Sequence, residues 1–237
     1  MPQDVPPPPH DPPRGPALLD LGPVAQLRAG RLPRRLAQLA VGLVLYGVSL
    51  AMMVRGGLGL APWDVFHSGV IRYLPLTLGQ AVVVTSFVLL LAFIPLRERP
   101  GVGTVANALV VGLAADATLA VLDHPDALVL DLVLMLGGVA LCGAATALYI
   151  GAQLGRGPRD GLMTGLHRRT GLSLRLVRTL IEVTVVLVGL VLGGRLGAGT
   201  VIFALAIGPL SQALLPVFLI DLPDPDRPDP HDGRVGA

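Results

Sequence analysis

Two segments of the chain share a spacing of glycine, proline and aspartate, residue types that could line a binding site. They are Gly-Leu-Gly-Leu-Ala-Pro-Trp-Asp at 57–64 and Gln-Leu-Gly-Arg-Gly-Pro-Arg-Asp at 153–160. Both copies keep the pattern Gly-x-x-Pro-x-Asp, formed by Gly59 and Gly155, Pro62 and Pro158, and Asp64 and Asp160. Proline suits the first turn of a helix, where a carboxylate also faces unpaired N–H groups and the positive end of the helix dipole. Each motif therefore predicts a short helix, over 65–74 and 161–170.

Other polar residues that could do chemistry lie inside long apolar segments. Asp116 has no obvious local partner, which makes it a candidate substrate or proton site, since a buried charge in such a segment usually faces protein or water. Asn107 is a further candidate, although such residues more often hydrogen-bond between helices. Arg178 and Glu182 lie four residues apart on one helical face, so we expect a structural ion pair.

The apolar segments themselves indicate a membrane protein. The chain has 237 residues, of which 52% are hydrophobic and 14% charged. Six segments are long enough to cross the hydrocarbon core, which takes roughly 20 residues of helix. Backbone groups cannot stay unpaired in lipid, so these segments must be helices, and the expected fold is all-α and polytopic. The predicted spans are 36–54, 76–96, 103–122, 129–151, 174–194 and 199–220.

The sequence also contains an internal duplication. Residues 58–118 align without a gap on residues 154–214, at an offset of 96, with 19 identities in 61 pairs. This predicts a first membrane repeat over 36–124 and a second over 125–220. Three spans per repeat is an odd number, so the second copy would enter the membrane from the opposite side, as in the inverted repeats of secondary transporters. The alternative is that duplication only built a larger helical bundle.

Two interpretations of the short helices remain open on this basis. A helix-start signal at the membrane surface accounts for the proline and the aspartate. Alternatively, the helices are re-entrant, and their N-termini and glycine-rich backbone line a cavity, as in transporters with broken helices. On the second interpretation the six shared motif residues, together with Thr164, border a substrate site.

The arginines predict the orientation, because basic residues accumulate in short cytoplasmic loops. Fifteen of the 18 basic residues, all arginines, lie on one side of the predicted spans, and Arg55, Arg72 and Arg195 lie on the other. We therefore expect both termini in the cytoplasm of a bacterium and the spans in its cytoplasmic membrane. Residues 1–35 are rich in proline and residues 221–237 in proline and aspartate, so both ends are predicted to be disordered tails.

Several kinds of function lack their sequence signals. The chain has no Walker loop, no Gly-x-Ser-x-Gly motif and no His-Glu-x-x-His motif, so we expect neither an enzyme nor a bound cofactor. Cys142 is the single cysteine, and His67 and His167 show no metal-ligand spacing. We expect both histidines at the surface and no metal site. A net charge of +2 gives no indication of nucleic-acid binding.

The motifs also resemble those of a known family. Gly-Leu-Gly-x-x-Pro-Trp-Asp after the first span, and Gly-x-Gly-Pro-Arg-Asp-Gly-Leu-Met after the fourth, are similar to the bacterial YczE/YyaS/YitT-like integral membrane proteins. The resemblance covers about residues 36–220. It implies a multi-pass protein of the bacterial cytoplasmic membrane and gives no established catalytic residue.

These observations predict a permease that moves a small solute or ion by alternating access of two inverted repeats around a site near Asp116. The alternative is a membrane accessory or scaffold protein that acts on a partner through its basic inner loops. The expected partners are the lipid bilayer and an unidentified small solute or ion, with a homo-oligomer or a membrane partner protein as further options.

Overall fold

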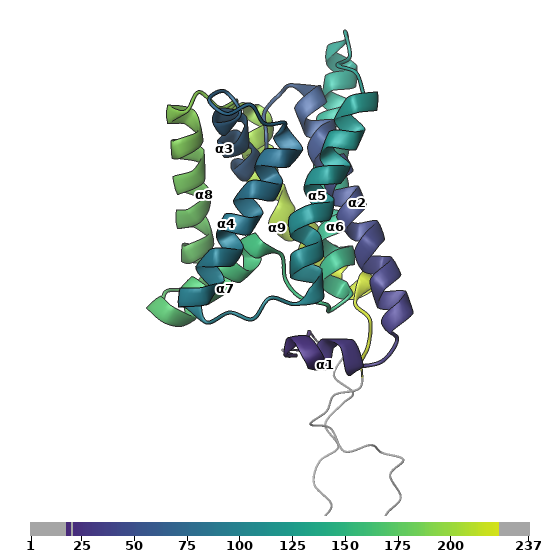
Figure 1. Cartoon of the computed structure of the whole chain (residues 1–237). Helices are drawn as coiled ribbons and strands as arrows, with labels where there is room; N and C mark the ends of the chain where they lie inside the picture. The colour runs from purple at the N-terminus through teal and green to yellow at the C-terminus, as the bar shows by residue number, and fades with distance from the viewer. Residues whose placement is uncertain (1–17, 20, 223–237) are drawn as a thin grey trace, which may run out of the picture.

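The computed structural model describes residues 18–19 and 21–222, and Figure 1 shows their arrangement as a bundle of helices. The helices in this part of the chain are α1 (Pro23–Arg28), α2 (Leu32–Gly56), α3 (Pro62–Val70), α4 (Leu78–Leu96), α5 (Val102–Val121), α6 (Leu128–Gly151), α7 (Pro158–Thr170), α8 (Leu174–Val191) and α9 (Ala198–Phe218).

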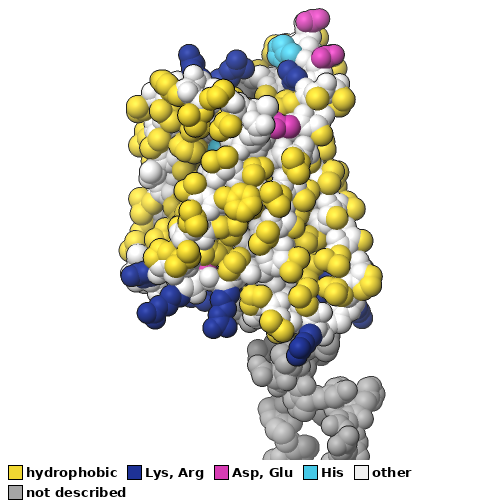
Figure 2. Space-filling model, in the orientation of Figure 1, with side chains coloured by type: hydrophobic (Ala, Val, Ile, Leu, Met, Phe, Trp, Pro, Cys, Tyr) yellow, Lys and Arg dark blue, Asp and Glu magenta, His cyan; other side chains and the backbone are white. Residues whose placement is uncertain are grey.

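Five of these helices, α2, α4, α5, α6 and α9, are long and apolar enough to cross a membrane. The sixth predicted span corresponds to α8, an 18-residue helix that carries Arg175, Arg178 and Glu182. The three arginines of α2 lie at its two ends, whereas the charges of α8 extend to the middle of that shorter helix. The face of the molecule in Figure 2 is apolar across its middle, with arginines at both ends, as a lipid-facing belt requires.

The boundary predicted for the N-terminal tail is wrong. Residues 23–28 form α1, and α2 begins at Leu32 with a proline in its first turn. Arg35, which the sequence placed in the tail, is fully buried. The proline-rich composition that predicted disorder belongs to residues 1–17, which lie outside the described residues, as do residue 20 and the C-terminal residues 223–237.

The short helices begin at the motif prolines, Pro62 for α3 and Pro158 for α7. The two predicted short helices are therefore present. Each begins at its proline and so includes the motif aspartate, whereas the predicted ranges began one residue after the aspartate. Gly171, with a φ of 71°, ends α7 in a left-handed turn. Figure 1 shows α3 and α7 near opposite ends of the bundle.

The four helices of the second copy begin 96 residues after their counterparts in the first copy. The paired first residues are Leu32 and Leu128, Pro62 and Pro158, Leu78 and Leu174, and Val102 and Ala198. The duplication seen in the sequence therefore extends to the position of every helix start from α2 onward.

Contacts between the two copies are also equivalent. Where Gly42 of α2 packs against the backbone of Ala145 and Tyr149 of α6, Gly138 of α6 packs against Ser49 and Met53 of α2. Each of these positions is 96 residues from its counterpart. Residues early in α2 contact residues late in α6, and residues late in α2 contact residues early in α6. The two helices therefore run antiparallel at the centre of the bundle.

The motif loops make a second matched pair of contacts. The N–H of Gly103, at the start of α5, donates to the carbonyl of Leu154 at 2.7 Å, and the N–H of Gly199, at the start of α9, donates to the carbonyl of Leu58 at 2.9 Å. Each loop is thus held by the other copy, directly before the glycine of its motif.

Candidate functional site

A cavity of about 160 Å³ lies where the two copies meet. Residues of all eight helices from α2 to α9 line it. In another protein an apolar cavity of about 150 Å³ holds benzene, so this space is sufficient for a small organic solute. Its polar and aromatic lining includes Tyr46, Trp63, Ser86, Asn107, Tyr149, Arg159, Asp160, Arg178, Glu182 and Ser211.

The lining is built from equivalent positions of the two copies. Twelve of its twenty residues form six pairs at the 96-residue offset. The pairs are Ala61 and Gly157, Trp63 and Arg159, Val82 and Arg178, Ser86 and Glu182, Asn107 and Phe203, and Val111 and Ile207. The backbone positions match, but within each of these pairs the side chains differ, and the charged members all come from the second copy.

Two of the acidic side chains have partners inside the protein. Glu182 accepts from Arg178 Nε at 2.8 Å, which confirms the ion pair predicted from their spacing. Asp160 accepts from the Tyr149 hydroxyl at 2.5 Å. The Tyr149 hydroxyl is neutral, so no charged side chain of the described residues is hydrogen-bonded to Asp160, whereas Arg178 and Glu182 offset each other.

Arg159 lies over an aromatic ring. Its guanidinium carbon is 5.1 Å from the centre of the Trp63 ring, a cation–π arrangement. None of the ion pairs among the described residues includes Arg159. The indole Nε1–H of Trp63 is buried and has no hydrogen-bond partner within the described part of the chain. The cavity lining therefore includes an arginine outside the described ion pairs and a tryptophan whose indole donor has no described partner.

The first motif aspartate lies in a different environment from the second. Asp64 is 1% exposed and its carboxylate is 3.0 Å from Nδ1 of His67, which is 0% exposed. The prediction that His67 is a surface residue is therefore wrong, because its position three residues after Asp64 places it on the buried face of α3. His167 is half-buried on α7. No group of three potential metal ligands occurs among residues 18–19 and 21–222.

The motif glycines position the loops and do not line the central cavity. Gly59 has a φ of 133° and Gly155 a φ of 120°. A Cβ on Gly59 would lie 2.9 Å from backbone atoms of Gly197 and Thr200, and one on Gly155 would lie 2.8 Å from the Thr104 hydroxyl. Both positions require glycine, since the backbone conformation and the close approach each exclude a side chain.

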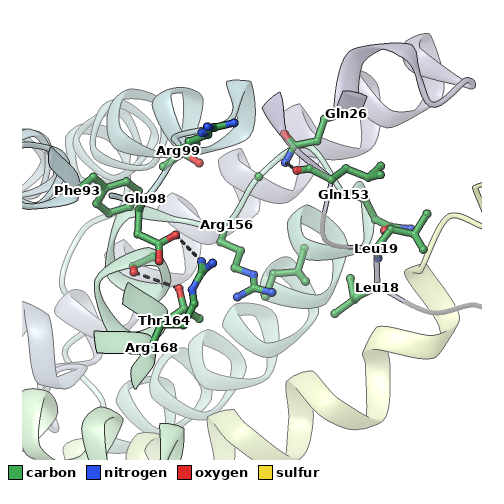
Figure 3. A pocket seen from close by; sticks show the side chains of 15 residues that line it. Leu18, Leu19, Gln26, Phe93, Glu98, Arg99, Gln153, Arg156, Thr164 and Arg168 are labelled. Carbon is green, nitrogen blue, oxygen red and sulfur yellow. Dashed lines mark hydrogen bonds and ion pairs between the residues drawn. The ribbon is translucent and has the colours of Figure 1, made fainter. Parts of the chain in front are cut away.

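Two further cavities lie at the ends of the bundle. Figure 3 shows one of about 110 Å³ that includes Thr164, Arg156 and the pair formed by Arg168 and Glu98, whose charged atoms are 2.7 Å apart. Gly155 also lines it. The other, of about 450 Å³, is lined by the equivalent Gly59 and Arg72. Thr164, a predicted site residue, therefore lies at an end cavity, and its hydroxyl bonds to the carbonyls of Asp160 and Gly161.

Comparison with known proteins gives the family. A model of a family of unknown function, DUF6198, matches residues 33–216. The chain belongs to this family. An uncharacterized protein of Haemophilus influenzae is 38% identical to it over 75% of this chain and 81% of that protein.

Two further relatives come from Bacillus subtilis. The uncharacterized membrane protein YczE is 28% identical over 74% of this chain and 82% of its own length, and the uncharacterized protein YyaS is 24% identical over 75% and 90%. The predicted resemblance is confirmed, and together with the five apolar helices it identifies this DUF6198 protein as an integral membrane protein. No solved structure matches the chain.

Asp116 lies outside the residues that line the central cavity. Its carboxylate accepts from the Thr77 hydroxyl and from the N–H of Gly79 at 2.8 Å, so it caps the N-terminus of α4 from the neighbouring helix α5. We expected Asp116 to have no local partner and to lie at the substrate site between the repeats. Both expectations differ from the structure. The cause is the loop before α4, which brings a helix start to a carboxylate 37 residues away.

The central cavity brings together some predicted residues and adds others. Asn107, Asp160, Pro62, Arg178 and Glu182 line it, whereas Pro158 and Asp64 are buried beside it. The sequence argument missed Trp63, Arg159, Tyr46 and Tyr149. Trp63 and Arg159 occupy the position between the proline and the aspartate, which differs between the two motifs. Their place inside the motif is the sequence feature that could have identified them.

Proposed function

We propose that this DUF6198 protein is a permease for a small polar solute, with the central cavity as its substrate site. The observation that supports this most directly is the set of six equivalent pairs lining one cavity between the two copies. A substrate bound there contacts both copies at once, so a change in their relative position alters its surroundings. Secondary transporters place their sites at repeat interfaces for the same reason.

The proposed mechanism is alternating access by two inverted repeats, with α8 as the sixth span. The antiparallel packing of α2 on α6 supports it, because a pseudo-twofold axis between antiparallel helices lies across them and so in the membrane plane. The starts of α3 and α7, which line the central cavity, would move relative to each other during exchange.

The proposed orientation places the end with α7 and the loop at 97–101 in the cytoplasm of a bacterium, following the arginine bias. We expect Asp126→Cys to react with a membrane-impermeant thiol reagent added outside intact cells, and Arg99→Cys to react only after the membrane is opened. Both positions are exposed, and the native Cys142 is buried and gives a low background. Equal labelling of the two variants in intact cells would contradict this topology.

Transport is tested with purified protein in liposomes. Labelled alanine, phosphate, choline and sorbitol represent the four charge classes of small solute. We expect at least one to enter faster than in protein-free vesicles. For alanine or choline, which carry a positive charge, Asp160→Asn should slow entry about tenfold or more, the cost of about 1.4 kcal/mol in binding a charged group. Asp123→Asn, an exposed aspartate on the loop before α6, is the matched control and should retain the rate.

If none of the four classes enters faster than in protein-free vesicles, the permease proposal fails. The accessory role, in which the arginine-rich end binds a partner protein, then becomes the better explanation.

A further inference from the structure

The charges at the central cavity indicate what kind of solute fits it. Four charged side chains line it, two arginines and two carboxylates. Arg178 and Glu182 pair with each other at 2.8 Å. This leaves Arg159, which has no carboxylate partner among the described residues, and Asp160, whose described partner is the neutral hydroxyl of Tyr149. One positive and one negative group remain for a ligand in the same small space.

The positive side of the cavity has a second donor. The indole Nε1–H of Trp63 is buried without a partner in the described residues, and Trp63 is only 7% exposed. A buried donor without a partner is unfavourable, so a ligand acceptor that reaches it restores the missing hydrogen bond. A carboxylate can accept from the guanidinium of Arg159 and from the indole of Trp63, whose ring lies beneath that guanidinium.

The negative side of the cavity is aromatic. Asp160 is held by Tyr149, and the Tyr149 ring packs against the Tyr46 ring edge to face, with centroids 6.1 Å apart. Both tyrosines line the cavity. A carboxylate beside aromatic rings suits an ammonium group, because the carboxylate supplies the charge and the ring faces attract cations.

We infer that the central cavity binds a small zwitterion, a solute that carries a carboxylate and an ammonium group a few bonds apart. Arg159 and Trp63 bind the carboxylate, and Asp160 with Tyr46 and Tyr149 binds the ammonium group. The inference rests on the proposed function of this cavity as a solute site. A ligand with a single charge would leave either Arg159 or Asp160 without a counter-charge, whereas a zwitterion matches both.

Binding is measured on the purified full-length protein in detergent. Trp63 is the single tryptophan of the chain, so its fluorescence reports on the site directly, and a shift in melting temperature gives a second readout. The probes are three zwitterions, alanine, proline and glycine betaine, and two half-ligands of alanine, propionate and ethylammonium. We expect at least one zwitterion to bind about tenfold or more tightly than either half-ligand.

Two variants test the binding of the two ends of the ligand separately. Arg159→Gln should remove the zwitterion's advantage over ethylammonium, and Asp160→Asn should remove its advantage over propionate. Arg159→Lys keeps the charge and should retain part of the binding, which guards against a variant that simply fails to fold. Asp123→Asn is again the matched control. Equal affinity for zwitterions and half-ligands, or no binding of any zwitterion by a protein that melts normally, would overturn the inference.

The outcome also distinguishes this inference from the proposed function. Zwitterion binding without entry into vesicles would refute transport and leave the site intact. Entry of phosphate, choline or sorbitol without zwitterion binding would support a permease and refute the zwitterion site.

Discussion

Gly59→Ala should leave little folded protein. A Cβ there would lie 2.9 Å from backbone atoms of Gly197 and Thr200, which cannot move away as a flexible side chain could. The φ of 133° is strained for any residue that has a Cβ. Backbone strain of about 1–3 kcal/mol and overpacking of a similar size together give about 2–6 kcal/mol, a large part of the stability of a typical domain.

The measurement is the melting temperature and the yield of monodisperse protein in detergent. Gly208→Ala is the matched control, because a Cβ at this position in α9 meets no atom within 4 Å. Alanine favours a helix interior over glycine by about 1 kcal/mol, so this variant should melt at the same temperature or slightly higher. A Gly59→Ala protein that melts together with the control would show that the motif loop tolerates a side chain.

Arg35→Ala should be the second strongly destabilising change. Arg35 is 0% exposed, and its guanidinium donates to the carbonyls of Ala152 at 2.8 Å and Gln153 at 2.6 Å, and also to the carbonyl of Gln26. It thus joins the segment around α1 to the loop that follows α6. Its positive charge also lies at the C-terminal end of α6, where the helix dipole favours it. Truncation leaves buried carbonyls unpaired and a side-chain-sized void, at a cost of about 3–5 kcal/mol.

Arg34→Ala is the control for this change, since its side chain is exposed one residue earlier in the same helix. Its effect should stay within about 0.5 kcal/mol, as for most surface substitutions. Arg35→Lys should fall between the two, because an ammonium group cannot reach three carbonyls in the way that a guanidinium does. Similar melting temperatures for Arg34→Ala and Arg35→Ala would contradict this account of the buried arginine.

Much of the fold could be predicted from the sequence because lipid imposes strong rules. The apolar segments gave the positions of the long helices, and the motif prolines gave the starts of α3 and α7. The spacing of Arg178 and Glu182 gave their ion pair, since residues four apart on a helix are neighbours whatever surrounds them. These features depend on local sequence alone.

The parts that could not be predicted depend on contacts between distant segments. Asp116 caps α4 because a loop brings Thr77 and Gly79 to it, and no spacing in the sequence encodes that meeting. His67 is buried because α3 packs its histidine face inward against other helices. Trp63 and Arg159 meet only because two segments 96 residues apart face each other across one cavity.

The mismatch between paired positions in the cavity bears on how such a protein arises. If two identical chains of one repeat each formed this cavity, every pair would hold the same side chain twice, so Arg159 would face a second arginine in place of Trp63. The like charges would repel, and opposite ends of a ligand could not be told apart. Gene fusion removes that restriction, because a substitution in one half no longer appears in the other. The second half holds the charged members of the pairs and the first half holds uncharged ones, a division that two identical chains could not have.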